Sequence, residues 1–167
     1  MLPIDPVKLS RRLGIEVLTA ELDDKIASLG VRERNQDPKI AVPAADSRSR
    51  QRFSVAYQIG YHLAFVNNSE YEQPYGHIVF REQFLAEPVH NDIAVKDQEM
   101  VVHGSEEIPE RERELIIYAR AFACELLMPI EEIEARSPEQ PVFMLALDFG
   151  VPPECVLFWQ RRLQLCD

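Results

Sequence analysis

Histidine and cysteine are the side chains best suited to metal binding or nucleophilic catalysis, and their spacing here limits both. The histidines are His62, His77, His90 and His103. His77 follows His62 by 15 residues, and His90 and His103 each follow the previous histidine by 13 residues. This is not the i, i+4 spacing of a zinc-binding helix. The cysteines are Cys124, Cys155 and Cys166, and they form no CxxC pair. A cysteine peptidase would need a histidine close in space to Cys124 or Cys155, and the sequence identifies none.

Two long helices are the elements that would position catalytic groups. From about Ser47 to Val66, apolar residues recur at steps of three and four, which predicts an amphipathic helix with a buried stripe. A second helix is predicted from about Glu110 to Leu127, and the following Met128-Pro129 would end it. Cys124 lies on the apolar side of this second helix, so we interpret it as a core residue.

Shorter elements surround these helices, and together they indicate an α+β chain. At the N-terminus the pattern predicts a helix over 6–13, a strand Ile15–Leu18, a short helix carrying Leu22, Ile26 and Leu29, and strands Val31–Arg34 and Lys39–Val42. Residues 68–109 favour a loop with one or two edge strands, within Tyr75–Phe84 and Ile93–Val102. Three short helices are predicted at Ile130–Ala135, Val142–Phe149 and Glu154–Leu165.

Four segments in the same order resemble one known family. RQRFSVAYQIGYHLAF (50–65) resembles the active-site helix of the ImmA/IrrE zinc metallopeptidases, usually R-x-R-F-T-x-A-H-E-x-G-H, and YARAFACELLMP (118–129) resembles their second signature. The opening LPIDPVKLSRRLGIEV (2–17) and the close LALDFGVPPECVLFWQRRL (145–163) are similar to the family's ends. The resemblance implies one zincin-like domain over residues 1–167. Its expected parts are a small sheet, two long core helices, a C-terminal helix pair, and a variable acidic segment over 68–110.

The positions that carry the family's chemistry hold other residues in this chain. In the family, two histidines four residues apart bind zinc, the glutamate between them activates water, and a glutamate from the second helix completes the site. The matching positions here are Tyr57, Gln58 and Tyr61. The third ligand position falls on Ile116, and an alignment shifted by one helical turn would place Glu112 there instead.

Each replacement removes part of the expected chemistry. A neutral phenol with a pKa of about 10 is a poor zinc ligand compared with imidazole. Gln58 cannot take a proton from water, and loss of a general base costs about 10²–10⁴ in rate. We therefore expect no zinc, no other cofactor and no catalytic residue at Tyr57, Gln58, Tyr61 and Ile116. These residues either fill the former cleft or bind a peptide or partner loop, for which tyrosine is a favoured anchor.

The residue pattern of the predicted C-terminal helix pair is typical of a helix-turn-helix, with the turn around Gly150. Only Arg161 and Arg162 supply positive charge there, whereas a DNA-reading helix usually carries a basic stripe. We therefore expect this pair to pack against the core rather than to bind nucleic acid.

Composition and charge set wider limits. Hydrophobic residues make up 46% and charged residues 28%, as in an average globular protein. The net charge of −10 argues against a non-specific nucleic-acid binder. Residues 68–114 hold 12 acidic and 4 basic side chains, which is either a solvated surface or a docking face for a basic partner. No apolar stretch reaches the ~18–20 residues of a membrane span, and the odd cysteine count favours a reducing cytoplasm.

Three functions remain after these arguments. The first is a catalytically inactive pseudopeptidase that acts as a protein-binding regulatory module, with a helix-turn-helix repressor as one candidate partner implied by the resemblance. The second is an active hydrolase with an unrecognised metal site among the histidines and carboxylates of the middle segment. The third is a structural subunit of a phage or mobile-element assembly.

Overall fold

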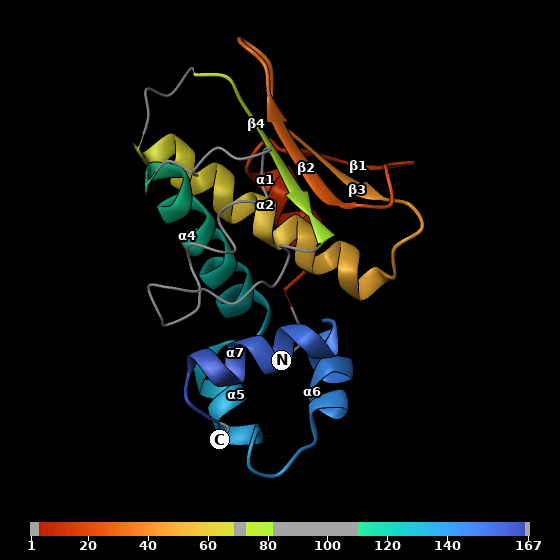
Figure 1. Cartoon of the computed structure of the whole chain (residues 1–167), viewed down its shortest axis with the longest axis vertical. Helices are drawn as coiled ribbons and strands as arrows, with labels where there is room; N and C mark the ends of the chain where they lie inside the picture. The colour runs from red at the N-terminus through yellow and green to blue at the C-terminus, as the bar shows by residue number, and fades with distance from the viewer. Residues whose placement is uncertain (1–3, 69–72, 82–109, 166–167) are drawn as a thin grey trace.

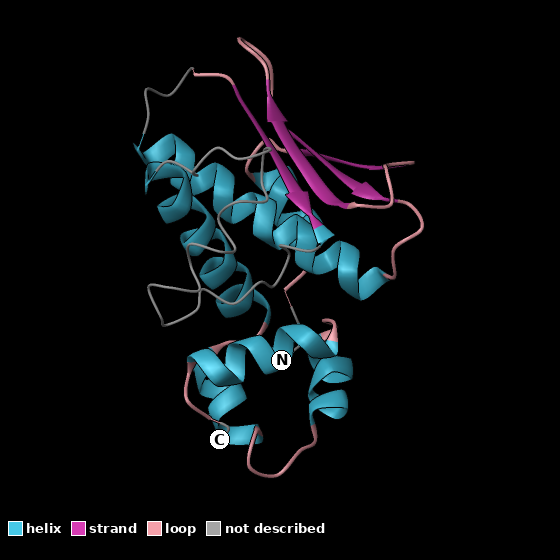
Figure 2. Ribbon diagram, viewed as in Figure 1, coloured by secondary structure: helices cyan, strands magenta, loops and turns pink. Residues whose placement is uncertain are grey.

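The computed structural model describes residues 4–68, 73–81 and 110–165, and its architecture is α+β. A four-stranded mixed sheet carries helices on one side (Figures 1 and 2). The strands are β1 (Glu16–Ala20), β2 (Ile26–Arg32), β3 (Lys39–Pro43) and β4 (Tyr75–Phe80). The helices are α1 (Pro6–Arg12), α2 (Arg48–Asn68), α4 (Glu110–Leu127), α5 (Ile130–Arg136), α6 (Val142–Phe149) and α7 (Pro153–Arg162).

The strand order of the sheet is β1-β3-β2-β4. β1 runs parallel to β3, while β2 is antiparallel to both of its neighbours. Among the described strands β4 lies at the edge of the sheet, as predicted for the start of Tyr75–Phe84. The other predicted edge strand, Ile93–Val102, lies outside the described residues.

The prediction of a short helix around Leu22, Ile26 and Leu29 is wrong, because strand β2 begins at Ile26 and continues to Arg32. The spacing of those apolar residues fits a helix, but β2 pairs with β3 on one side and β4 on the other. A strand with neighbours on both sides satisfies its backbone groups through pairing, and those partners are not visible in a local pattern. The strand expected at Val31–Arg34 is the end of this longer strand.

The two long core helices are confirmed, and they approach each other closely at Gly60. A Cβ atom added to Gly60 would lie 2.9 Å from the Cβ of Phe122 and 3.0 Å from the Cα of Ala119. The absence of a side chain at Gly60 therefore sets the distance between α2 and α4. The contact also fixes which face of α4 turns toward the site described below.

The C-terminal helices pack on this core, as predicted for the pair at 145–163. The indole Nε1 of Trp159 donates a hydrogen bond to the carbonyl oxygen of Met128 at 3.0 Å. Arg50 at the start of α2 forms an ion pair with Glu154 at 2.7 Å. Gly150, with φ of +64°, makes the left-handed turn between α6 and α7.

Among the described helices, none is long and apolar enough to cross a membrane by itself. α6 and α7 taken together reach the necessary length and apolar composition, but they meet at a bend of 107°. Much of α7 is buried within the protein, including Phe158 and Trp159.

Candidate functional site

Four polar side chains from three elements meet between α2, β4 and α4. They are Tyr57 and Tyr61 from α2, His77 from β4 and Glu112 from α4, and we call them the Tyr–His–Glu cluster. The Tyr57 hydroxyl lies 3.0 Å from His77 Nε2, and His77 Nδ1 lies 3.2 Å from Glu112 Oε1. The Tyr61 hydroxyl donates to both oxygens of Glu112, at 2.9 and 3.0 Å. The imidazole of His77 stacks on the Tyr61 ring, with centroids 3.8 Å apart and planes 4° from parallel.

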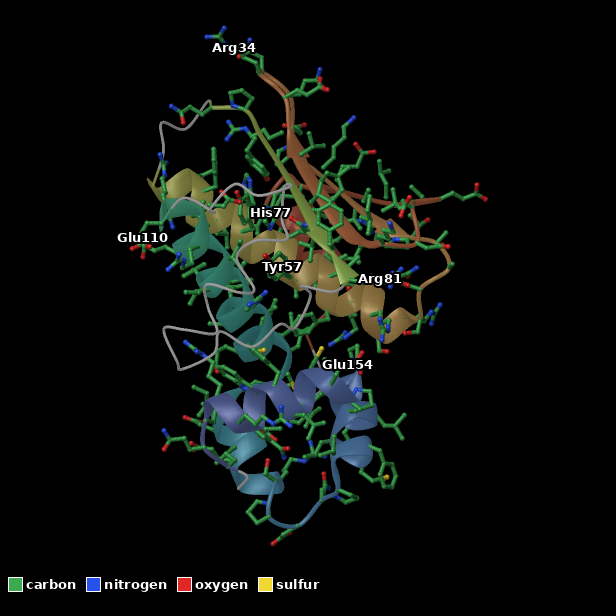
Figure 3. The ribbon with its side chains drawn as sticks, in the orientation of Figure 1. Arg34, Tyr57, His77, Arg81, Glu110 and Glu154 are labelled. Atoms are coloured by element: carbon green, nitrogen blue, oxygen red, sulfur yellow. The ribbon has the colours of Figure 1, made fainter. Side chains whose placement is uncertain are left out.

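Each element presents its residues through its own periodicity. Tyr57 and Tyr61 are four residues apart on α2, so they share one face of the helix. His77 and Val79 alternate with exposed Gly76 and Ile78 along β4, so the His77 side chain points toward the helices (Figure 3). Glu112 lies in the first turn of α4, where a carboxylate is favoured by the helix dipole.

The hydrogen-bond donors of the cluster follow from its geometry. An ionised Glu112 can only accept hydrogen bonds, so His77 carries a proton on Nδ1. When the imidazole is neutral, its Nε2 accepts the proton of the Tyr57 hydroxyl. Tyr57, His77 and Glu112 thus form a chain of two hydrogen bonds, and Tyr61 donates a third to the same carboxylate.

The ionisation states of the three acids are consistent with these roles. Burial raises the pKa of Tyr57, and the positive charge of Arg120 offsets only part of that rise. Burial and the neighbouring Glu112 carboxylate raise the pKa of Tyr61. Burial alone would raise the pKa of Glu112, but hydrogen bonds from His77 and Tyr61 outweigh it, so the pKa lies below its usual value. At neutral pH both phenols keep their protons, and Glu112 is ionised.

The chain of groups has the order of a carboxylate–histidine–hydroxyl relay, as in serine hydrolases. Its hydroxyl end is Tyr57, which is only 2% exposed, and His77 is 7% exposed. A hydroxyl at that depth has almost no surface that a substrate could contact. In this structure the relay therefore joins α2, β4 and α4 and does not present a reactive group.

Gln58, at the predicted general-base position, points toward the sheet instead of toward this cluster. Its Nε2 donates to the hydroxyl of Ser28 at 2.9 Å, and its Oε1 is buried without a hydrogen-bond partner in the part of the chain that is described. A Cβ atom on Gly30 would lie 2.4 Å from that oxygen. The close approach of Gln58 explains why β2 has a glycine at this position.

The structure separates the two candidates for the third position on α4. The carboxylate of Glu112 contacts both Tyr61 and His77. Ile116 is half-buried and lies one helical turn further along α4. Sequence reasoning identified Glu112 only through a shifted alignment and did not place His77 in the site. The available signal for His77 was the alternation along Tyr75–Phe80, which predicts that His77 and Val79 face the same side.

The residues of the cluster do not fit the zinc ion that the family resemblance implies. Zinc prefers imidazole, thiolate and carboxylate ligands, whereas Tyr57 and Tyr61 are phenols that keep their protons. Among the described residues, no group of three histidine, cysteine, aspartate or glutamate side chains could hold a metal ion. His90 and His103 are among the histidines of the middle segment that were considered as metal ligands, and they lie outside the described residues.

The described cysteines offer no activated thiol. Cys124 and Cys155 are both free and fully buried. Burial raises the pKa of the Cys124 thiol to about 12 and that of Cys155 well above its ordinary value. Both thiols are therefore protonated at neutral pH, which is the opposite of what a cysteine nucleophile requires.

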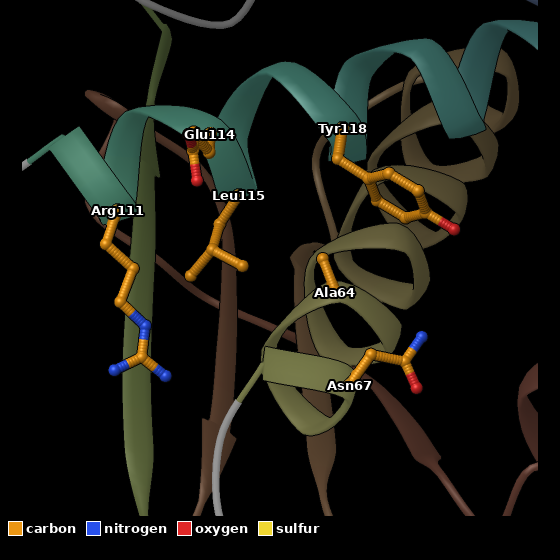
Figure 4. Close-up of a pocket in the computed structure, with 6 residues that line it drawn as sticks. All are labelled: Ala64, Asn67, Arg111, Glu114, Leu115 and Tyr118. Atoms are coloured by element: carbon orange, nitrogen blue, oxygen red, sulfur yellow. The ribbon is translucent and has the colours of Figure 1, made fainter.

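A pocket lies one helical turn from the cluster along the same two helices. It has a volume of about 550 Å³, and Figure 4 shows its walls on α2 and α4. Its lining residues are Ala64, Asn67, Arg111, Glu114, Leu115 and Tyr118. Ala64 and Leu115 follow Tyr61 and Glu112 by three residues each, and Tyr118 is 45% exposed. The pocket thus combines the apolar side chains of Ala64 and Leu115 with one positively charged residue, Arg111, and one negatively charged residue, Glu114.

His62 pairs with β4 on another side of α2. Its Nδ1 lies 2.9 Å from the hydroxyl of Tyr75. Burial, helped by the positive charge of Arg32, lowers the pKa of His62 to about 4. The imidazole is therefore neutral in the folded protein at neutral pH.

This shift predicts a loss of stability in mild acid. As the pH falls, the unfolded chain, in which the pKa of His62 is about 6.5, binds a proton before the folded protein does. The stability that neutral His62 gives the folded protein is therefore complete above pH 6.5 and is lost between pH 6.5 and about pH 4. Because the side chain is partly exposed, we expect a loss of about 1–2 kcal/mol. Urea unfolding at about pH 7 and about pH 4.5 should show this extra loss in the wild type and not in His62→Gln. Equal losses in both proteins would contradict the assignment.

No protein-family model matches the chain, and a comparison with curated proteins finds no match either. The ImmA/IrrE resemblance of the four sequence segments therefore stays a prediction.

Proposed function

We propose that this chain is a zincin-like protein of the ImmA/IrrE type that has lost its peptidase chemistry and acts as a protein-binding regulatory module. The observation that carries the proposal is the Tyr–His–Glu cluster. Tyr57 and Tyr61 occupy the positions expected for two zinc ligands, and Glu112 faces them from the second long helix. In this cluster the polar groups are hydrogen-bonded to one another.

Two further observations support a non-catalytic role. Gln58, which would have to be a glutamate in order to activate water, is an amide held by Ser28 beneath the sheet. The side chains of Tyr57 and Tyr61 are each 2% exposed, so both tyrosines of the cluster are part of the buried core. Residues that once served chemistry would then serve packing, since a network of satisfied buried polar groups stabilises one arrangement of the helices.

The pocket between α2 and α4 is the part of this region that a partner could enter. We propose that it receives an exposed loop or side chain of a protein partner, with Tyr118 as an anchor and Arg111 and Glu114 at its rim. A basic, DNA-binding repressor is the partner class to test first, because the net charge of the chain is −10.

The first test is the metal content of the protein, purified without a histidine tag and measured by elemental mass spectrometry. We expect far less than one zinc per chain and no change in Tm on adding a chelator. One tightly held metal per chain would overturn the proposal and favour the second function, a hydrolase with a different metal site. His77 and Glu112 would then be the first ligands to examine, because they are already 3.2 Å apart.

A binding measurement separates the proposed module from the third function, a structural subunit. Titration calorimetry with a purified helix-turn-helix repressor should detect binding that Tyr118→Ala weakens by about 10-fold or more. Leu157→Ala is the matched control, because this apolar side chain is exposed to a similar degree, 38%, and lies on α7, which does not line the pocket among the described residues. Equal effects of both substitutions would show that the pocket is not the binding site.

A further inference from the structure

Strand β1 lies at an edge of the sheet among the described strands, and the backbone groups of two of its five residues point away from the sheet. In the described residues, β1 has β3 as its one strand neighbour. The Glu16 N–H donates to the Pro38 carbonyl at 3.0 Å, and the Ala20 carbonyl accepts from the Ala44 N–H at 2.8 Å. Because hydrogen-bonding direction alternates along a strand, Leu18 also faces β3. Val17 and Thr19 therefore direct their N–H and C=O groups outward.

This edge carries few of the features that usually block strand pairing. β1 contains no proline, and its register with β3 is regular from Glu16 to Ala20. Its single charged residue, Glu16, lies 3.8 Å from Lys39 on the neighbouring strand. An unblocked edge of this kind is a template for a further strand.

On the face of the sheet away from the helices, apolar side chains from the four strands form a row, and this row ends at the β1 edge. Leu18 is the register partner of Ala41, Ala41 of Leu29, and Leu29 of Ile78. Leu18 is 42% exposed and Ile78 is 37% exposed, whereas Ile40 and Val42 on the opposite face are buried. The row crosses all four strands and is open to solvent at β1 and β4.

We propose that a second copy of the chain pairs with this edge, β1 against β1 and antiparallel, with a two-fold axis at Leu18. In that register Val17 lies opposite the partner's Thr19, and Thr19 opposite the partner's Val17. These are the residues whose backbone groups point outward, so the pair exchanges four hydrogen bonds in the antiparallel pattern. The two sheets become one sheet of eight strands.

Side chains and charge are compatible with the same register. Leu18 lies opposite the partner's Leu18, which joins the two apolar rows into one. Glu16 lies opposite the partner's Ala20, so no like charges face each other directly. Residues 1–50, which contain β1, carry 9 basic and 8 acidic side chains, a net charge of +1. The negative charge of the chain lies in residues 51–167, so association through β1 brings two nearly neutral regions together.

Sedimentation of the whole chain over a concentration series tests the proposal. We expect the average mass to rise from 19.2 kDa toward twice that value between about 1 µM and about 1 mM, because one short strand pair makes a weak interface. Leu18→Lys places two positive charges face to face at the axis and should weaken association at least about 10-fold. The control is Ile78→Lys, the same change on the same face about 14 Å from β1, which should associate like the wild type.

Cross-linking gives an independent reading of the register. Leu18 and the partner's Leu18 form a non-hydrogen-bonded pair with Cα atoms about 4.5 Å apart, a distance that a disulfide can bridge. In a Cys166→Ser background, Leu18→Cys should therefore give a covalent dimer on mild oxidation, and Ile78→Cys should not. The proposal is overturned if the chain stays monomeric throughout the series, if both lysine variants associate equally, or if Leu18→Cys gives no dimer.

Discussion

Replacing Tyr57 and Tyr61 with histidine is expected to convert the Tyr–His–Glu cluster into a zinc site. The two imidazoles would lie four residues apart on one face of α2, and Glu112, whose carboxylate is 2.9 Å from the Tyr61 hydroxyl, would be the third ligand. We expect about one zinc per chain with a Kd below about 1 µM. Gln58 is kept, because it is buried and its amide donates to Ser28, so a glutamate there would bury a charge and lose that donor.

Zinc titration with a competing chelator and thermal unfolding measure this outcome. At a free zinc concentration of about 100 times Kd, binding should add about 2.7 kcal/mol to the free energy of unfolding. The wild type should show no comparable gain. If the double variant bound no more zinc than the wild type, the inference that these positions share a metal-binding face would be wrong.

Two further variants decide which residue of α4 is the third ligand. Adding Glu112→Gln to the double variant should weaken zinc binding at least about 10-fold, because the amide is a much poorer ligand. Adding Ile116→Glu should leave zinc affinity nearly unchanged, since position 116 lies one turn beyond the cluster. The opposite pair of results would support the unshifted sequence alignment, in which Ile116 occupies the ligand position.

The second large effect is expected for Gly60→Ala, which should destabilise the contact between the long helices. The new Cβ would lie 2.9 Å from Phe122 and 3.0 Å from the backbone of Ala119, so α2 and α4 must separate. Overpacking of this kind costs about 1–3 kcal/mol, and here a backbone atom is involved. Because the backbone of Ala119 cannot move aside as a side chain can, we take the upper end of this range. Alanine favours the helix by about 1 kcal/mol over glycine, so we expect a net loss of about 2 kcal/mol.

Thermal or urea unfolding of Gly60→Ala checks this prediction, and Gly76→Ala is its matched control. A Cβ atom on Gly76 meets no heavy atom of the described residues within 4 Å, and the backbone φ of Gly76 is not positive. Gly76→Ala should therefore change the free energy of unfolding by less than about 0.5 kcal/mol. A Gly60→Ala protein as stable as this control would mean that the helices tolerate a wider separation than the packing indicates.

The long helices show how much of this fold could be predicted. The second was expected at Glu110–Leu127 and has those bounds, and the first was expected from about Ser47 to Val66 and runs from Arg48 to Asn68. Helical hydrogen bonds join residues four apart, so the spacing of apolar residues within one segment is enough to indicate such an element. The i, i+4 placement of Tyr57 and Tyr61 on one face follows from the same local rule.

Strand β2 and the members of the site from β4 and α4 depended on contacts between distant segments. The apolar spacing around Ile26 resembles that of a helix, and only pairing with β3 and β4 makes this segment a strand. His77 and Glu112 are 20 and 55 residues from Tyr57 along the chain, yet His77 contacts both tyrosines and Glu112 contacts Tyr61. The local order of residues identified the helices, and it placed Tyr57, Gln58 and Tyr61 at the positions that the resemblance matches to the family's ligand and base residues. Which side chains lie beside Tyr57 and Tyr61 was decided by sheet pairing and by helix packing at Gly60, because these bring together residues with no common local pattern.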